Sequence, residues 1–119
     1  MDQRRVARVA ESIREELSQI IGFEMKDPRL VGVTVAEVRV TPDGREAHIR
    51  VMMYGTPEEQ KDAMAGLQHA KGHLRHEIGH RMELRHVPEL FFETDTGTEA
   101  ATRVEELLRR VRKNRRELQ

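Results

Sequence analysis

The stretch His76-Glu77-Ile78-Gly79-His80 has the H-E-x-x-H pattern of zinc hydrolases. On a helix, this pattern places two imidazoles on one face as zinc ligands and makes the intervening glutamate a candidate general base. His86 follows six residues after His80, which is the third-ligand spacing of one class of zinc protease. These residues define the first hypothesis, a zinc-dependent hydrolase that uses Glu77 as its base.

The helix that must position these histidines argues against a zinc site. On a helical projection they fall in one narrow arc, and the apolar stripe centred on Leu74 lies nearly opposite. We therefore expect them to face solvent, whereas the zinc ligands of a hydrolase lie in a cleft where further groups orient each ring. The usual motif also has a glycine three residues after its second histidine, where this chain has Glu83. The histidines of the arc are His69, His73, His76 and His80. The sequence favours a solvated helix face, and we predict no catalytic residue, no metal and no cofactor.

The length and composition suit one small domain. The chain has 119 residues, so we predict a single domain over residues 1–119, with a basic tail at about 109–119. It contains no cysteine, which excludes disulfides and thiolate metal sites and fits a reducing cytoplasm. No apolar run approaches a membrane span, and residues 1–25 are too charged for a signal peptide. We therefore expect a cytoplasmic protein with no membrane partner.

The charges are numerous but balanced. Lysine and arginine number 21, aspartate and glutamate also number 21, and the formal net charge is zero. Overall charge therefore predicts no nucleic-acid partner, and any such site must come from local clustering.

The hydrophobic periodicity predicts the order helix, strand, strand, long helix, strand, helix. The strands at 33–41 and 46–54 should form a hairpin, with an irregularity after Val35 where the apolar phase shifts. A helical crossover separates the second strand from the third, so we expect these two to be parallel neighbours. The predicted helices are 3–25, 56–85 with a break or kink at Gly72, and 98–111; the predicted third strand is 87–95. The fold class is α+β, with a three-stranded sheet packed against helices.

This order, with a kink at Ala70-Lys71-Gly72, resembles a type II KH domain. Most KH domains have a G-x-x-G loop between two helices, where the nucleic-acid backbone approaches closely. Here an A-x-G step stands at that junction, which is typical of the ribosome-binding factor A family. Three stretches carry the resemblance: "RVARVAESIREELSQII" (5–21), "KDPRLVGVTVAEVRVTPDGREAHIRV" (26–51) and "LQHAKGHLRHEIGHRMELRHVPELFFETD" (67–95). The chain is similar to this family over residues 4–108.

The resemblance implies a single KH-like domain that is not an enzyme. It would bind the immature small (30S) ribosomal subunit and its 16S rRNA. A monomer is the default expectation, because the sequence does not give the oligomeric state. It would assist late maturation of that rRNA, including the 5′-end region, particularly in the cold, and leave before translation starts. Because the net charge is zero and aromatic residues are few, its RNA contacts should be local and directed at the backbone.

The candidate RNA-binding residues are mostly cations near the A-x-G step and the hairpin. A small residue at Gly72 would let an RNA backbone come close. For each arginine, a solvated or salt-bridging surface role is about as well supported as an RNA contact. The candidates are Lys26, Arg29, Arg45, Arg50, Ala70, Lys71, Gly72, Arg75, Arg81 and Arg85.

Two alternatives to this assignment remain open. The basic run at 109–116 is either an RNA-contacting tail or a frayed helix end. The long helix could instead serve a protein-interaction module, which co-sedimentation with small subunits would separate from an rRNA-binding factor.

Overall fold

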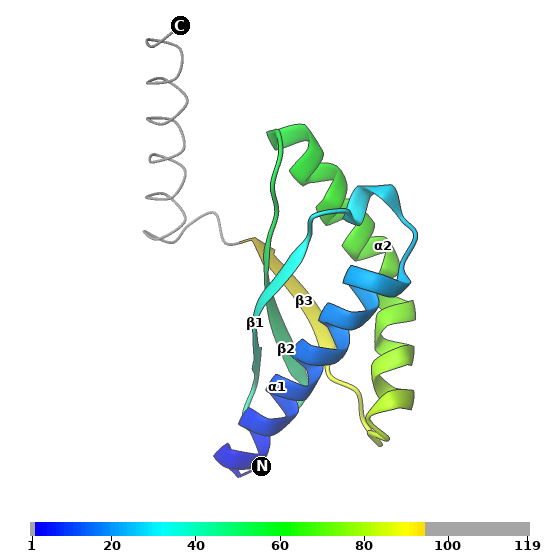
Figure 1. The fold of residues 1–119 in the computed structure, drawn as a ribbon. Helices are drawn as coiled ribbons and strands as arrows, with labels where there is room; N and C mark the ends of the chain where they lie inside the picture. The colour runs from blue at the N-terminus through cyan, green and yellow to red at the C-terminus, as the bar shows by residue number, and fades with distance from the viewer. Residues whose placement is uncertain (1, 95–119) are drawn as a thin grey trace, which may run out of the picture.

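The computed structural model describes residues 2–94, which form an α+β domain of two helices and a three-stranded sheet (Figure 1). The elements are α1 (Gln3–Gln19), the π-helical turn η1 (Ile20–Glu24), the 3-10 turn η2 (Pro28–Leu30), β1 (Thr34–Val40), β2 (Glu46–Met52), α2 (Pro57–Arg81) and β3 (Glu89–Thr94). The predicted fold class and element order are confirmed over this range. The predicted last helix and the basic tail lie outside the described residues.

The sheet has the strand order β1-β2-β3, with β1 antiparallel to β2 and β2 parallel to β3. The parallel pairing confirms the prediction from the helical crossover. The register shifts between Val35 and Glu37, so the predicted irregularity is also confirmed. The extra residue restores the alternation, and Val38 and Val40 then face the core as Val35 does.

Helix α1 begins at Asp2, whose side chain accepts a hydrogen bond of 3.2 Å from the Arg4 amide. Its apolar stripe buries Ala10, Ile13 and Leu17. The helix was predicted to reach residue 25, but its last turn is the wider π-helical turn η1, which buries Ile20 and Ile21.

Helix α2 begins with a capping box in which Thr56 and Glu59 satisfy each other's backbone amides, and Pro57 occupies the first turn. Of the predicted break or kink at Gly72, the break is absent: α2 is one continuous helix, whose axis Figure 1 shows bending about half-way along. A glycine costs about 1 kcal/mol in a helix interior, but each fully buried Leu or Ile contributes about 1.5–3 kcal/mol. Packing therefore outweighs local propensity here. The buried residues are Ala63, Gly66, Leu67, Ala70, Leu74 and Ile78.

Helix α2 ends at Arg81, four residues before the predicted boundary. Glu83 follows with a φ of 53°, so the chain leaves the helical direction there and turns toward β3. None of the helices in residues 2–94 is long and apolar enough to cross a membrane.

The core lies between the helices and one face of the sheet. The inward-facing residues of all three strands are buried against α1 and α2; they are Val35, Val38, Val40, Ala47, Ile49, Val51, Leu90 and Phe92. Because side chains alternate along a strand, the opposite face carries the other half of the strand residues. That face and the outer side of α2 both carry exposed polar residues.

Candidate nucleic-acid interface

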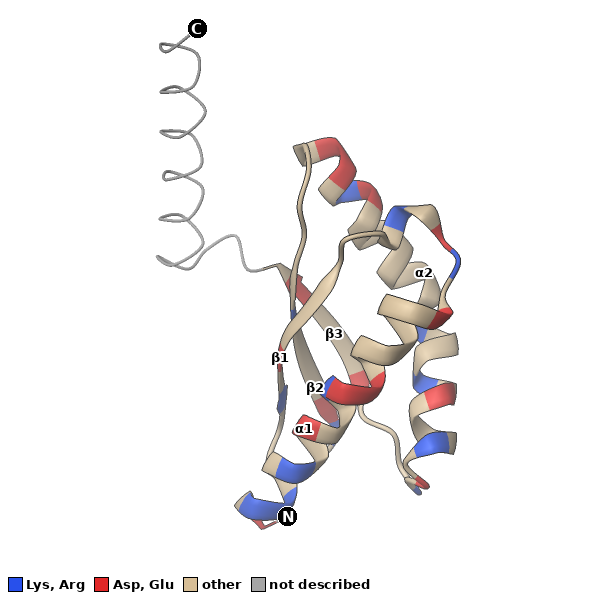
Figure 2. Ribbon diagram, in the orientation of Figure 1, with Lys and Arg blue, Asp and Glu red and all other residues tan. Residues whose placement is uncertain are grey.

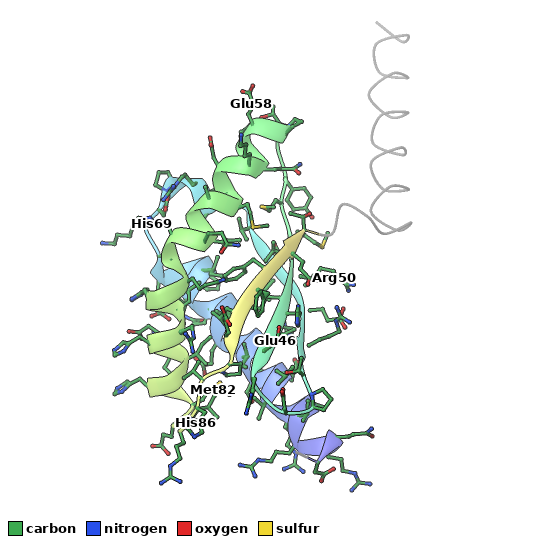
Figure 3. The ribbon with its side chains drawn as sticks, turned by 180° about the vertical axis from the view of Figure 1, so that it is seen from behind. Glu46, Arg50, Glu58, His69, Met82 and His86 are labelled. Atoms are coloured by element: carbon green, nitrogen blue, oxygen red, sulfur yellow. The ribbon has the colours of Figure 1, made fainter. Side chains whose placement is uncertain are left out.

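The open face of the sheet is one candidate surface for nucleic acid. We define the sheet surface by its charged and aromatic residues: Glu37, Arg39, Glu46, His48, Arg50, Phe91 and Glu93. Figure 3 shows Glu46 and Arg50 on β2, with His69 of α2 at the opposite side of the view.

The cations of the sheet surface pair with carboxylates on neighbouring strands. Arg50 Nη2 lies 2.6 Å from Glu37 Oε2, and Arg39 Nη2 lies 3.9 Å from Glu93 Oε2. His48 Nδ1 lies 2.9 Å from Glu93 Oε1. The charges of this face therefore offset one another across the strands.

The aromatic ring of Phe91 is also engaged. It stacks on the His48 ring, with centroids 5.2 Å apart and an interplanar angle of 15°. Lys71 Nζ lies 5.3 Å from the Phe91 centroid, which is a cation–π contact between α2 and β3. Because these two neighbours already contact Phe91, the ring is a poor platform for a stacking base.

The outer side of α2 is the second candidate surface. We define the helix surface as the exposed face of its C-terminal half, with Lys71 and Arg75 at the border toward β3. Its exposed members are His69, Gly72, His73, His76 and His80, which confirms the predicted solvent-facing arc. At Gly72 an added Cβ would meet nothing within 4 Å, so the backbone there is open to an approaching ligand.

The two border cations are held in place without being neutralised. Arg75 Nη2 donates to the Val87 carbonyl at 3.0 Å, and Lys71 rests on Phe91. Within residues 2–94, neither forms an ion pair with a carboxylate. Arg75 keeps further N–H donors for an anion. Both predicted residues therefore carry charge that a phosphate could use.

Arg81 lies in a different environment, at the centre of an ion-pair cluster. Its guanidinium contacts both carboxylate oxygens of Glu24, with Nη1 to Oε2 at 2.7 Å, and reaches Glu77 at 3.2 Å and Glu16 at 3.7 Å. Hydrogen bonding to Glu24 raises the pKa of Arg81, and the same bonds lower the pKa of Glu24. The cluster ties α1 and η1 to α2, so any RNA contact by Arg81 would compete with three carboxylates.

Arg29 is paired in a similar way. Its Nε and Nη2 donate to the Asp27 carboxylate at 3.1 and 2.7 Å, and these bonds lower the pKa of Asp27. Asp27 also accepts from the Arg29 amide and so caps η2. The turn at Asp27 and Arg29 is thus a self-contained structural unit.

The remaining predicted residues are spread over the domain. Lys26, Arg45 and Arg85 are exposed and have no ion pair within the part of the chain that the structure describes. Ala70 is buried, with 8% exposure, and packs in the core beneath the helix surface. The structure brings Ala70, Lys71, Gly72 and Arg75 together on one segment of α2; the hairpin residues lie elsewhere.

A further cationic cluster was missed by the sequence analysis. Arg4, Arg5 and Arg8 are exposed on the first turns of α1, where Figure 2 shows basic residues gathered at the N-terminal end. Within the described residues these arginines form no ion pair. Their position off the apolar stripe of α1 was the available signal, but it marks any solvated face equally well.

The zinc hydrolase hypothesis finds no support in this geometry. All six histidines lie within residues 2–94, and there no group of three His, Asp or Glu side chains is placed to hold a metal ion. The turn after α2 at Glu83 leaves His86 exposed in the loop that leads to β3.

Comparison with known families identifies the protein family of the chain. The family model described as ribosome-binding factor A matches residues 5–108. The chain belongs to the ribosome-binding factor A family. A family member from Solibacter usitatus (strain Ellin6076) is 50% identical over 115 residues, covering 97% of this chain and 94% of the relative. A member from Brevibacillus brevis is 41% identical and covers 93% and 92% of the two chains.

Solved structures of family members have the same fold. The crystal structure of ribosome-binding factor A from Thermus thermophilus superposes with a TM-score of 0.67 at 27% identity, covering 75% of this chain and 94% of the other. A homology model of the Thermus thermophilus protein, fitted into a cryo-electron-microscopy map of a 30S–RbfA complex, matches with a TM-score of 0.58 at 27% identity. That comparison covers 78% of this chain and 93% of the other.

The residues that match the family model include those of the helix surface. The match over residues 5–108 includes the A-x-G step at Ala70-Lys71-Gly72 and both turns of α2 that follow it. In this chain the step lies inside a continuous helix, so the open backbone at Gly72 comes from a missing side chain and not from a break in hydrogen bonding.

Proposed function

We propose that this chain binds the immature small ribosomal subunit and contacts 16S rRNA phosphates through the helix surface. The observation that carries the proposal is the pair Lys71 and Arg75 beside the open backbone of Gly72. These are positioned cations that no carboxylate of residues 2–94 neutralises. The Thermus relative fitted into a 30S complex map supports the same partner.

The RNA contacts of this surface are directed at the backbone. Each phosphate contact releases counterions, so the logarithm of the affinity falls as the logarithm of the salt concentration rises. Each contact adds about 0.7 to 0.9 to the steepness of that fall. With a net charge of zero, the chain attracts arbitrary RNA weakly. Affinity for the subunit then depends on a few positioned cations. The exposed arginines at the start of α1 are a second group of candidate contacts.

The wider role that we propose is that of a non-enzymatic assembly factor. Acting as a KH-like monomer in the cytoplasm, it assists late maturation of 16S rRNA, including the 5′-end region, with the largest effect in the cold. It leaves before translation starts. The family assignment supports this role, and the geometry of the histidines gives no support to hydrolysis.

Co-sedimentation with immature small subunits across a salt series tests the binding site. Lys71→Ala with Arg75→Ala should weaken binding and make its salt dependence flatter. The slope of log affinity against log salt should become shallower by about 1.4 to 1.8, because two phosphate contacts are lost. The matched control is Arg39→Ala with Arg50→Ala, which removes two cations that already face carboxylates and should change the slope less. Melting curves establish that each variant is folded.

Deletion of residues 109–119 separates this site from the basic tail. The family match ends at residue 108, so we expect the deletion to matter less than the helix-surface pair. Loss of binding in the deletion, together with normal binding by the pair variant, would assign the RNA contact to the tail and contradict the proposal.

Complementation tests the maturation role. A bacterial strain that lacks its own ribosome-binding factor A should accumulate 16S rRNA precursors with an unprocessed 5′ end at low temperature. This chain should reduce that accumulation, and the Lys71→Ala, Arg75→Ala variant should not. Equal rescue by both proteins would separate the maturation role from the helix surface.

A further inference from the structure

The function proposed above gives no individual role to a row of histidines on the helix surface. Its members are His69, His73, His76 and His80; they succeed one another at spacings of three and four residues, and all are exposed. We propose that this row contacts rRNA phosphates in its protonated form, so that binding of the small subunit is coupled to proton uptake by α2. The inference rests on the proposed function and adds residues and a pH dependence to the same surface.

The row surrounds Gly72, where the backbone of α2 carries no side chain. Gly72 lies between His69, His73 and His76, and a Cβ at Gly72 would meet nothing within 4 Å. Helix neighbours three and four residues apart have Cβ atoms about 5–6 Å from each other. A phosphate that approaches Gly72 therefore comes within reach of imidazoles on the preceding and the following turn.

The carboxylates that face the row already have arginine partners. Glu77 lies on α2 itself and Glu24 reaches it from η1; both bond Arg81. Asp27, ahead of η2, bonds Arg29. Within residues 2–94, none of the four histidines forms an ion pair. Glu24 lies close enough to His73, and Asp27 to His69, for a positive imidazole to help lower the pKa of each carboxyl, but the arginines hold both carboxylates. The histidines therefore keep their ring nitrogens for an incoming phosphate.

The cations around the row add to its attraction for an anion. Lys71 and Arg75 border it on the side toward β3 and form no ion pair within residues 2–94. Lys26 and His73 line a hollow of about 370 Å³, which Arg81 and two of its three carboxylate partners also line. At the end of the row, His80 lies in the last turn of α2, where the helix dipole favours a positive charge.

The expected direction of the pH effect follows from linkage. Imidazoles protonate just below neutral pH, and contact with a phosphate favours the charged form, which raises the pKa in the complex. A pKa that is higher in the complex strengthens binding at low pH, and this gain is lost as the pH rises through the pKa of the complex. An imidazole whose pKa rises by about one unit binds roughly sixfold more tightly at about pH 6 than at about pH 8.

Co-sedimentation with immature small subunits at about pH 6, 7 and 8, at fixed ionic strength, tests the inference. The first variant replaces His69, His73 and His76 by glutamine, which is never charged; the second replaces them by arginine, which is always charged. Glutamine and arginine are both good helix formers, so both variants should fold. His86→Gln is the control, because His86 is exposed outside the row.

We expect wild-type protein and the control to bind at least tenfold more tightly at the lowest pH than at the highest. The glutamine variant should bind weakly at every pH, with little pH dependence. The arginine variant should bind tightly throughout, with a steeper salt dependence than wild type at about pH 8, because it offers more cations to phosphates.

Three other outcomes would contradict the inference, the phosphate assignment or the proposed function. A glutamine variant that binds like wild type at every pH would overturn the inference and leave the proposed function standing. An arginine variant that restores binding without a steeper salt dependence would indicate an acidic protein partner and overturn the phosphate assignment. Failure of wild type to co-sediment at any pH would overturn the proposed function and the inference with it.

Discussion

The sheet surface and the helix surface both carry basic side chains but differ in how those charges are used. On the sheet surface, Arg39 and Arg50 face carboxylates of neighbouring strands. On the helix surface, Lys71 and Arg75 contact a ring and a backbone carbonyl and keep their charge. A chain with zero net charge can therefore present one neutralised face and one electropositive face. What matters for an anionic partner is which cations lack a carboxylate, and composition does not show that.

The largest expected effect concerns the core that both surfaces share. Leu74 is fully buried beneath the helix surface, so Leu74→Ala should lower the free energy of unfolding by about 2–5 kcal/mol. The loss should impair both surfaces together, because the same core positions α2 and the sheet. Chemical denaturation measures the effect, with exposed Gln68→Ala as the control. A stability loss below about 1 kcal/mol would mean that α2 packs on the sheet less closely than the structure shows.

The next prediction removes the difference between the two surfaces. Glu37→Gln with Glu93→Gln takes away the carboxylates that face Arg50 and Arg39 while keeping the shape of the side chains. The sheet surface should then attract arbitrary RNA, with a salt slope that grows by about 0.7 to 0.9 for each new phosphate contact.

Filter binding to an unrelated RNA across a salt series measures this slope. The control is Glu58→Gln with Glu59→Gln, which removes two carboxylates at the distant end of α2. An equal increase in both variants would show that net charge alone, and not the pairing of cations, controls RNA attraction.

The third prediction concerns the ion-pair cluster at the edge of the helix surface. The pKa of Glu24 is lowered from 4.5, mainly by hydrogen bonds from Arg81. Because the folded-state pKa is the lower one, the contribution to stability is complete above pH 4.5 and is lost as the pH falls through the folded value. Wild-type protein should therefore lose melting temperature in acid more steeply than Arg81→Met, which has already lost the cluster.

Melting curves from neutral pH to about pH 3 provide the measurement. Arg85→Met removes an exposed arginine outside the cluster and should melt in acid as wild type does. Parallel acid profiles for Arg81→Met and wild type would show that the cluster does not contribute to stability.

Local sequence signals predicted the elements but not the pairing of their charges. The start of α2 near residue 56 and the phase shift at Val35 are read from neighbouring residues, and both were predicted from sequence. The contact between Glu24 and Arg81 joins residues 57 positions apart, which no local pattern reveals. Glu37 comes to lie opposite Arg50 because the bulge shifts the register of β1. Arg50 and Arg81 were therefore chosen as candidate RNA contacts, on sequence grounds that could not include their carboxylate neighbours.

The sequence left open a break or a kink at Gly72, and it could not decide between them for a related reason. Helix propensity is a local quantity, whereas the continuity of α2 depends on burial of Leu67, Leu74 and Ile78 against elements far away in the sequence. The same residue still marks the candidate site, because the missing side chain opens the backbone whether or not the helix breaks.

The smallest expected effect comes from two glycines of α2 that look alike in sequence. Gly72→Ala should raise the free energy of unfolding by up to about 1 kcal/mol, because alanine favours the helix and its methyl group meets nothing within 4 Å. Gly79→Ala makes the same propensity gain, but its Cβ would lie 2.7 Å from Val87 Cγ2, so the loop before β3 must shift. We expect the second substitution to be neutral or destabilising. Denaturant titrations of both variants measure the difference.

The Gly72→Ala variant should also keep its subunit binding within about twofold, since one methyl group leaves Lys71 and Arg75 in place. Co-sedimentation measures this binding. A large loss of binding without loss of stability would show that the RNA backbone packs directly against Gly72, more closely than contacts through the flanking side chains require.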